Sequence, residues 1–181
     1  MLRFAPTRNS LLALLVAALS VPLFAQHQKR EPLNAVQIDK IREAGIDPDE
    51  RVKLYTQFVG EHVDTIHALA GRARSSARAH RLDSELLDLA ALMDEFGSNL
   101  DLYSERKADV RKSLEALNKA APGWLSAIRA LSSEPIFDLS RKEAIDSAQD
   151  IADQAAQMLK EQTEYFKEHK EQRGQDRYEH Q

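Results

Sequence analysis

The chain has 181 residues, a formal net charge of −4 at pH 7, 43% hydrophobic and 30% charged residues, and no cysteine. This composition is too apolar for wholesale disorder, its length suits one domain, and its charge gives no overall attraction to nucleic acid. The lack of cysteine excludes disulfides, thiol chemistry, c-type haem attachment and cysteine-based zinc clusters.

Residues 1–25 differ in composition from the rest of the chain. Two arginines precede an apolar run from Leu11 to Ala25, and a basic start followed by an apolar core and a small residue is typical of a secretory signal peptide. The run has 15 residues, fewer than the roughly 20 that span a bilayer, so we favour a cleaved signal over an uncleaved anchor. We expect cleavage after Ala25, with Ser20 as the alternative, and a periplasmic or secreted protein.

Residues 26–33 are predicted to be a linker, and residues 34–173 a helical bundle domain. A short helix is expected between Asn34 and Gly45. The first long helix then begins at Asp47, a good N-cap residue, followed by Pro48, which suits the first helical position. Its apolar stripe recurs at alternating steps of three and four residues, as in a heptad pattern: Val52, Tyr55, Val59, His62, Ile66, Leu69 and Ala73.

The second long helix is predicted to run without a break through Gly97. We place the turn before it between His80 and Leu82, where the stripe changes phase, although a longer continuous helix is the alternative. Its end is expected before Pro122, because proline disfavours helical geometry in the preceding residue. The stripe keeps its spacing with Lys107 as the only polar interruption: Leu82, Leu86, Leu89, Met93, Phe96, Leu100, Tyr103, Lys107, Val110, Leu114 and Leu117.

A short helix around Trp124 and a third long helix capped by Asp138 or Ser140 complete the domain, and residues 174–181 are predicted to be a flexible tail. The last stripe again contains one polar residue, Gln162: Ala144, Ala148, Ile151, Ala155, Met158, Gln162 and Tyr165. Helices with one apolar stripe must pack on each other, and heptad spacing favours shallow crossing angles. We therefore predict an all-α fold, an elongated antiparallel bundle of three long helices with short accessory helices.

The stretch from Asp47 to His67 holds the residues that most resemble metal ligands. His62 and His67 are five residues apart and do not share a helix face, whereas Asp64 and His67 do. A di-iron bundle needs two Glu-x-x-His pairs and further inward acids, and the sequence has none of these pairs. We interpret Asp64 and His67 as exposed, and His62, which lies on the stripe, as a hydrogen-bonded core residue.

The segment "GRARSSARAHR" is a local excess of positive charge. It contains Arg72, Arg74, Arg78 and Arg81 together with His80. Its functional interpretation is a contact with a polyanion or a membrane surface, and the alternative, which we favour from sequence, is a solvated helix face.

Several stretches resemble those of exported helical bacterial proteins to which no activity is assigned. They are "DPDERVKLYTQFV", "NLDLYSERKADVRKSLEALNKA", "GWLSAIRAL" and "KEQTEYFKEHKEQRGQDRYE". The resemblance covers most of the chain after residue 25, implies export and a helical fold, and assigns no site.

The sequence contains no Gly-x-Ser-x-Gly, phosphate-binding glycine loop or dinucleotide fingerprint. We therefore expect a non-catalytic bundle that binds another protein or self-associates in the cell envelope, without a cofactor, without nucleic acid and without a membrane span after signal cleavage. The alternative is a metal- or cofactor-binding bundle built on His62, Asp64 and His67.

Overall fold

The computed structural model describes residues 30–173, and within this range the chain is helical and contains no strand. The predicted signal peptide at 1–25 and tail at 174–181 lie outside the described residues. The elements are α1 (Ala35–Glu43), α2 (Pro48–Ala70), α3 (Ser76–Arg106), α4 (Arg111–Arg129), α5 (Asp138–Glu168) and a short 3-10 helix, η1 (Lys170–Gln172).

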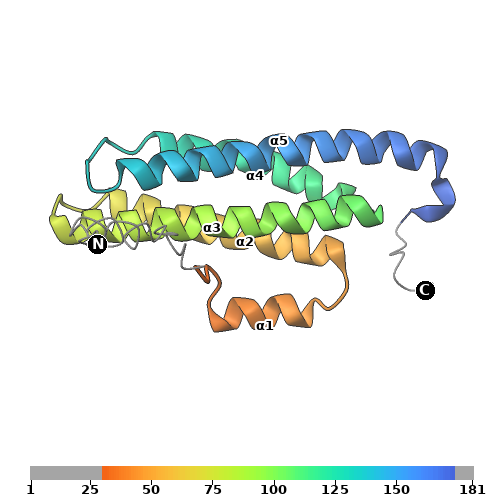
Figure 1. The fold of residues 1–181 in the computed structure, drawn as a ribbon, viewed down its shortest axis with the longest axis horizontal. Coiled ribbons are helices and arrows are strands. Elements are labelled where there is room, and N and C mark those ends of the chain that lie inside the picture. Colours follow the sequence, from red (N-terminus) through yellow and green to blue (C-terminus); the bar gives the residue numbers. More distant parts are fainter. Residues whose placement is uncertain (1–29, 174–181) are drawn as a thin grey trace, which may run out of the picture.

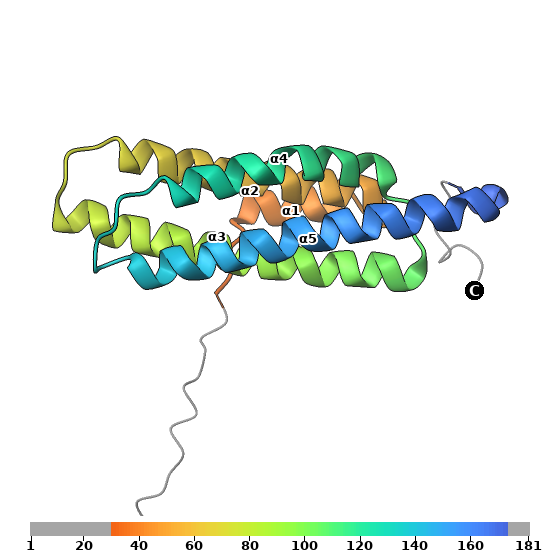
Figure 2. The same ribbon diagram turned by 90° about the horizontal axis from the view of Figure 1, so that it is seen from above.

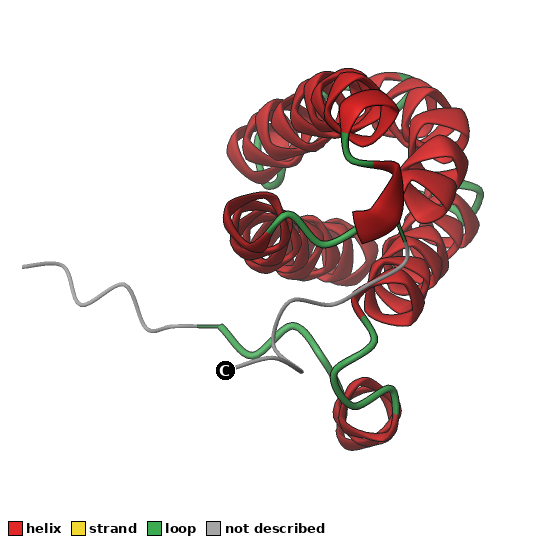
Figure 3. Cartoon of the chain, turned by 90° about the vertical axis from the view of Figure 1, so that its right-hand side faces the viewer, coloured by secondary structure: helices red, strands yellow, loops and turns green. Residues whose placement is uncertain are grey.

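The four helices α2 to α5 form an elongated bundle, and α1 lies along its outside (Figure 1). Both α3 and α4 pack against α2 and α5, so α3 lies diagonally opposite α4. Seen end on, the bundle helices surround a common axis (Figure 3). The chain reverses direction after each bundle helix (Figure 2). Consecutive helices are therefore antiparallel, whereas the neighbours α2 and α4, and α3 and α5, run parallel.

The predicted all-α class is confirmed, but the arrangement of three long helices is wrong. The helix expected to continue from residue 82 to 121 is two helices, most of α3 and the first half of α4. The segment around Trp124, expected to be a separate short helix, is the second half of α4. The continuity of α3 through Gly97 is confirmed.

Lys107 ends α3, and this turn is the reason that the bundle has four helices. Its backbone is left-handed, with φ of 57°. The Lys107 amide donates to the Ser104 carbonyl at 3.1 Å and the Ala108 amide donates to the Tyr103 carbonyl at 3.0 Å, which is the Schellman ending of a helix. Glycine usually occupies this position, and because a lysine stands here, no glycine marks the turn in the sequence.

Gln162 of α5 binds the backbone of the same turn. Its side-chain amide donates to the Ala108 carbonyl at 2.8 Å, and its oxygen accepts from the Val110 amide at 3.2 Å. All three residues are buried, and buried backbone groups need such partners. The polar interruptions of two predicted stripes, Lys107 and Gln162, thus belong to one structural feature.

Pro122 lies inside α4 rather than after it. Proline in a helix interior removes one hydrogen bond and costs about 3 kcal/mol. Pro122 is exposed, and the helix continues because Trp124, Leu125 and Ile128 beyond it are buried in the core. Burying three such side chains stabilises the fold by several kcal/mol, at roughly 1.5–3 kcal/mol each, which outweighs the cost of the proline.

The turn between α2 and α3 lies at residues 71–75, earlier than the predicted position between His80 and Leu82. Ser75 caps α3 by accepting the Arg78 amide at 3.2 Å. The Arg78 side chain turns inward and its Nε donates to the Leu69 carbonyl at 3.1 Å, at the end of α2. Since a buried arginine takes an inward position in the first turns of α3, the apolar pattern changes phase there without a break in the helix.

The predicted N-cap of α2 is confirmed, and the predicted N-cap of α5 is wrong. Asp47 caps α2, accepting from the Asp49 amide at 3.0 Å, with Pro48 in the first position, as predicted. Neither Asp138 nor Ser140 caps α5, whose N-cap position is Phe137. Asp138 instead accepts from the Glu134 amide at 3.1 Å in the preceding loop.

We expect Gln162→Leu to lower the free energy of unfolding by about 2–4 kcal/mol, because it leaves a buried amide and a buried carbonyl unpaired at about 1–3 kcal/mol each. Urea denaturation followed by circular dichroism measures the change. Gln157→Leu on the exposed face of the same helix is the control and should change stability by less than about 0.5 kcal/mol. Equal stability of the two variants would contradict the role of Gln162.

Lys107→Gly should be more stable than Lys107→Ala by roughly 1 kcal/mol, because alanine keeps the Cβ that makes the left-handed backbone costly. Both variants remove the Lys107 ammonium, which lies 5.8 Å from the Tyr165 ring centroid, so the comparison isolates the backbone. An alanine variant as stable as the glycine variant would show that the turn differs from the one described.

Candidate functional site

The short helix α1 is attached to the outside of the bundle by a small number of side chains. Ile41 and Gln37 face inward, and the Gln37 amide donates to Glu61 of α2 at 3.1 Å. A capping box between Asn34 and Gln37 fixes its first turn. Val36 on the same helix is exposed. The position of α1 therefore depends on a few polar links rather than on a large apolar interface.

Arg51 of α2 connects the end of α1 to α3. Its Nε donates to the Tyr103 hydroxyl at 3.0 Å, and its Nη1 lies 3.5 Å from the Ile41 carbonyl and 3.4 Å from the Gly45 carbonyl. Gly45 has a positive φ of 58°, a conformation that glycine adopts without strain. The guanidinium thus holds the α1–α2 turn beside the last turns of α3.

A cleft of about 280 Å³ opens between this turn and α3. Its described lining combines apolar and cationic side chains: Gly45, Ile46, Arg51, Asn99, Leu102, Tyr103 and Arg106. Ile46 is 65% exposed and Leu102 is 54% exposed, so the rim of the cleft presents two large aliphatic side chains to solvent. The lining includes two arginines and no acid, so the cleft attracts negative charge.

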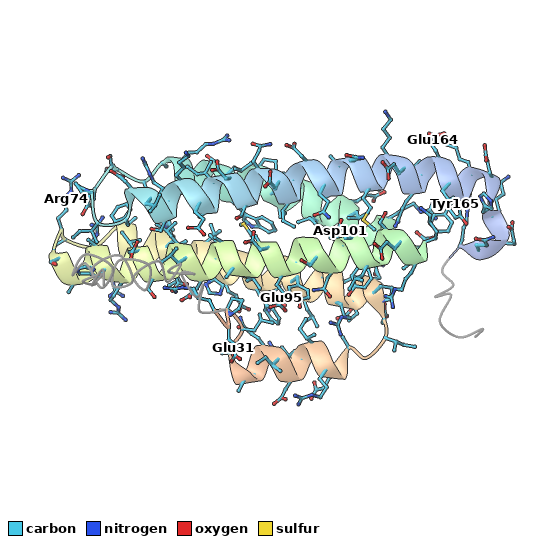
Figure 4. The ribbon with its side chains drawn as sticks, in the orientation of Figure 1. Glu31, Arg74, Glu95, Asp101, Glu164 and Tyr165 are labelled. Atoms are coloured by element: carbon cyan, nitrogen blue, oxygen red, sulfur yellow. The ribbon has the colours of Figure 1, made fainter. Side chains whose placement is uncertain are left out.

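Tyr55 of α2 fixes α3 below the cleft through contacts with Glu95 and Phe96. The Tyr55 hydroxyl donates to Glu95 at 2.6 Å, and its ring stacks on Phe96 with centroids 5.1 Å apart. Burial and the Glu95 carboxylate raise the pKa of the Tyr55 phenol well above its usual range, so it stays a neutral donor. Figure 4 shows Glu95 on the side of α3 that faces α1. These contacts hold the part of α3 that lies below the cleft, while the rim above it carries both apolar and polar side chains.

The structure does not bring the predicted metal-ligand candidates together. Asp64 and His67 are exposed, and His62, partly buried, has its Nδ1 2.7 Å from Glu85 of α3. His62 is hydrogen-bonded as predicted, but it lies at the edge of the core rather than inside it. Among residues 30–173 no group of three or more His, Cys, Asp or Glu side chains has the arrangement of a metal site.

The arginines of the predicted basic run have different environments. Arg78 is buried and pairs with Glu134 at 2.7 Å, which the interpretation as a solvated helix face did not anticipate. Arg72, Arg74 and Arg81 are exposed. Their position relative to the α4–α5 loop follows only from the tertiary structure.

None of the residues that line the cleft was predicted from sequence to belong to a functional site. Leu102 was one signal that could have pointed to it, because it is a leucine off the predicted stripe of α3. The second was Ile46, an isoleucine in a turn between Gly45 and Asp47. Neither residue type is diagnostic, because single exposed aliphatic residues are common on protein surfaces.

Comparison with protein-family models, with curated proteins and with solved structures gives no match for this chain. The resemblance to exported helical proteins and the exported location therefore stay predictions. None of the described helices is long and apolar enough to cross a membrane.

Asp49 links the start of α2 to the start of α4 at the cleft end of the bundle. Its carboxylate accepts the Ser113 amide at 3.1 Å and pairs with Lys53 at 2.8 Å. This bond supplies an N-terminal partner for α4, which has no side-chain cap of its own. Partial burial opposes the charged form, but Lys53 and Ser113 outweigh it and hold the pKa of Asp49 below its ordinary value of 3.8.

We expect Asp49→Asn to be about 1 kcal/mol less stable than the wild type at pH 7, because it loses the charge at two helix starts. Since the folded pKa is below the unfolded one, this stabilisation is complete above pH 3.8 and is lost as the pH falls through the folded pKa. The difference in unfolding free energy should therefore shrink below pH 3.8. Glu50→Gln is the control, since Glu50 is half-exposed and its loss should change stability by less than about 0.5 kcal/mol.

Proposed function

We propose that this protein is a non-catalytic helical bundle of the cell envelope that binds another protein through the cleft between the α1–α2 turn and α3. The single observation that carries the proposal is the pair of exposed aliphatic side chains, Ile46 and Leu102, at a cleft that also contains two arginines. Such a mixture of apolar and cationic groups is typical of an anchor site in a protein interface.

The size of the cleft favours a side chain of a partner over a free small molecule. Sites for small molecules and cofactors usually have volumes of about 300–1,000 Å³ and enclose most of the ligand. The volume here is about 280 Å³, and the two aliphatic residues at the rim remain largely exposed. One or two partner side chains would fill the cleft, and a protein around them would cover the rim.

The charge of the lining indicates the chemistry of the partner. Arg51 is held by carbonyls and by the Tyr103 hydroxyl, which are neutral acceptors, so its positive charge is not neutralised by these bonds. Asn99 adds a polar side chain to the lining. An extended or helical segment with an apolar residue next to an Asp or Glu would match the aliphatic rim and the guanidinium together.

We expect Leu102→Asp to weaken partner binding strongly, because it places a carboxylate in the apolar part of the rim. Affinity capture of envelope proteins with the wild type identifies the partner, and calorimetry with that partner measures the loss. Truncating or reversing an anchor residue costs at least about 2 kcal/mol, so the dissociation constant should rise roughly 30-fold or more.

Leu139→Asp is the matched control, since Leu139 is also an exposed leucine, 80% accessible. It lies in the first turn of α5, and α5 starts at the end of the bundle opposite the α1–α2 turn (Figure 1). This variant should capture the same partner as the wild type and bind it with the same affinity. Circular dichroism should show that both variants keep the helical content of the wild type. A partner that binds both variants with wild-type affinity would show that the cleft is not the interface.

A further inference from the structure

The end of the bundle opposite the cleft concentrates exposed positive charge and exposed aliphatic side chains. We call it the basic end and define it by six residues, the cations Arg72, Arg74, Arg81 and Lys142 and the aliphatic residues Ile136 and Leu139. They come from the α2–α3 turn, the first turns of α3, the α4–α5 loop and the start of α5. Figure 4 shows Arg74 at the tip of the molecule.

Ion pairs and a hydrogen bond hold the α4–α5 loop and the start of α5 against the α2–α3 turn and the start of α3. Glu134 of the α4–α5 loop lies 2.7 Å from Arg78 and 3.9 Å from Arg74. The Ser140 hydroxyl donates to Asp83 of α3 at 2.7 Å. The exposed residues from the two loops therefore share one surface in fixed positions.

Three of the acids near the basic end, Glu134, Asp138 and Asp83, are engaged in contacts within it. Glu134 pairs with the buried Arg78, and Asp138 accepts from the Ser133 hydroxyl and the Glu134 amide. Asp83 accepts from Ser140. Of the acids nearby, Glu143 is exposed. The outward charge of this end is thus positive, although the whole chain is negative.

The aliphatic side chains distinguish this surface from a solvated basic face. Leu139 is 80% exposed and Ile136 is 41% exposed. Exposed leucine has no favourable interaction with a soluble polyanion, but it gains hydrophobic free energy on entering the interface of a bilayer. Anionic lipid headgroups attract the surrounding arginines and the lysine at the same time.

We propose that the basic end is a docking surface for an anionic lipid bilayer, with Leu139 and Ile136 entering the headgroup region and Arg72, Arg74, Arg81 and Lys142 contacting lipid phosphates. The bundle then stands on the membrane by one end, with the cleft at the other end turned toward the aqueous space. The proposal does not depend on the partner site, because no residue belongs to both surfaces.

The chain contains no cysteine, so a single introduced cysteine carries an environment-sensitive fluorophore at one place. The full chain is labelled through Ser132→Cys at the basic end, or through Glu164→Cys, an exposed position near the opposite end (Figure 4). Vesicles of phosphatidylcholine, with and without phosphatidylglycerol, are added. We expect a blue shift at position 132 with phosphatidylglycerol vesicles, and no shift at position 164. Because residues 1–29 are the same in all variants, the difference between positions reports which end touches the lipid.

Two sets of substitutions in the Ser132→Cys chain separate lipid docking from other contacts. Replacing Arg72, Arg74 and Arg81 by Gln should raise the lipid concentration that gives half of the blue shift about 100-fold, because each lost charge weakens lipid binding about fivefold. Leu139→Ser should weaken it by at least about tenfold. No shift at position 132, or equal shifts at both positions, would overturn the proposal. So would a response to heparin that equals the response to vesicles and is unchanged by Leu139→Ser, because that result would identify a soluble polyanion as the ligand.

Discussion

The architecture depends on a chain reversal at one end of the bundle, where Ala108 and Val110 are buried and the Gln162 side chain pairs with their backbone groups. Between Arg106 and Arg111 the chain leaves one helix and begins another on the diagonally opposite side of the core. Such a turn carries backbone amides and carbonyls into an apolar environment, where an unpaired group costs about 1–3 kcal/mol. Gln162 binds one amide and one carbonyl of this turn, so α5 has to lie beside it. The position of α5 against both α3 and α4 follows from this contact.

Helix ends elsewhere in the bundle are also satisfied by side chains from other helices. Asp49 of α2 accepts an amide at the start of α4, and Arg78 of α3 binds a carbonyl at the end of α2. Arg141 of α5 donates to the Leu131 carbonyl of the preceding loop at 2.6 Å. Since each of these contacts joins two different elements, together they fix the longitudinal register of helices whose apolar stripes alone would permit sliding. Rigid ends are also what an elongated bundle needs if its functional surfaces lie there.

The two surfaces differ in what surrounds their aliphatic residues. At the cleft, Ile46 and Leu102 flank a concave site with two arginines, a shape that suits a protruding partner side chain. At the basic end, Leu139 in the first turn of α5 and Ile136 in the preceding loop are exposed among several cations, an arrangement that suits a broad anionic surface. The contact of Arg51 with the α1–α2 turn holds the cleft in shape, and the ion pair between Glu134 and Arg78 does the same for the basic end. The sequence shows the basic run that supplies three cations of the basic end, but it does not show the rest of either surface, because each is assembled from segments far apart in the chain.

The sequence alone determined the helical class and the continuity of α3 through Gly97 from the apolar stripes, and the start of α2 from Asp47 and Pro48. Both the period of a stripe and the chemistry of a helix cap are local properties. The stripes could not locate the turn at Lys107, since the three-four spacing of inward residues resumes at Val110 after a reversal that contains neither glycine nor proline. They also could not show that α4 passes through Pro122, because the burial that offsets the cost of proline comes from other helices. Whether Lys107 and Gln162 interrupt a stripe or complete a turn, and how many helices therefore share the core, was decided only when the tertiary structure brought α5 against the end of α3.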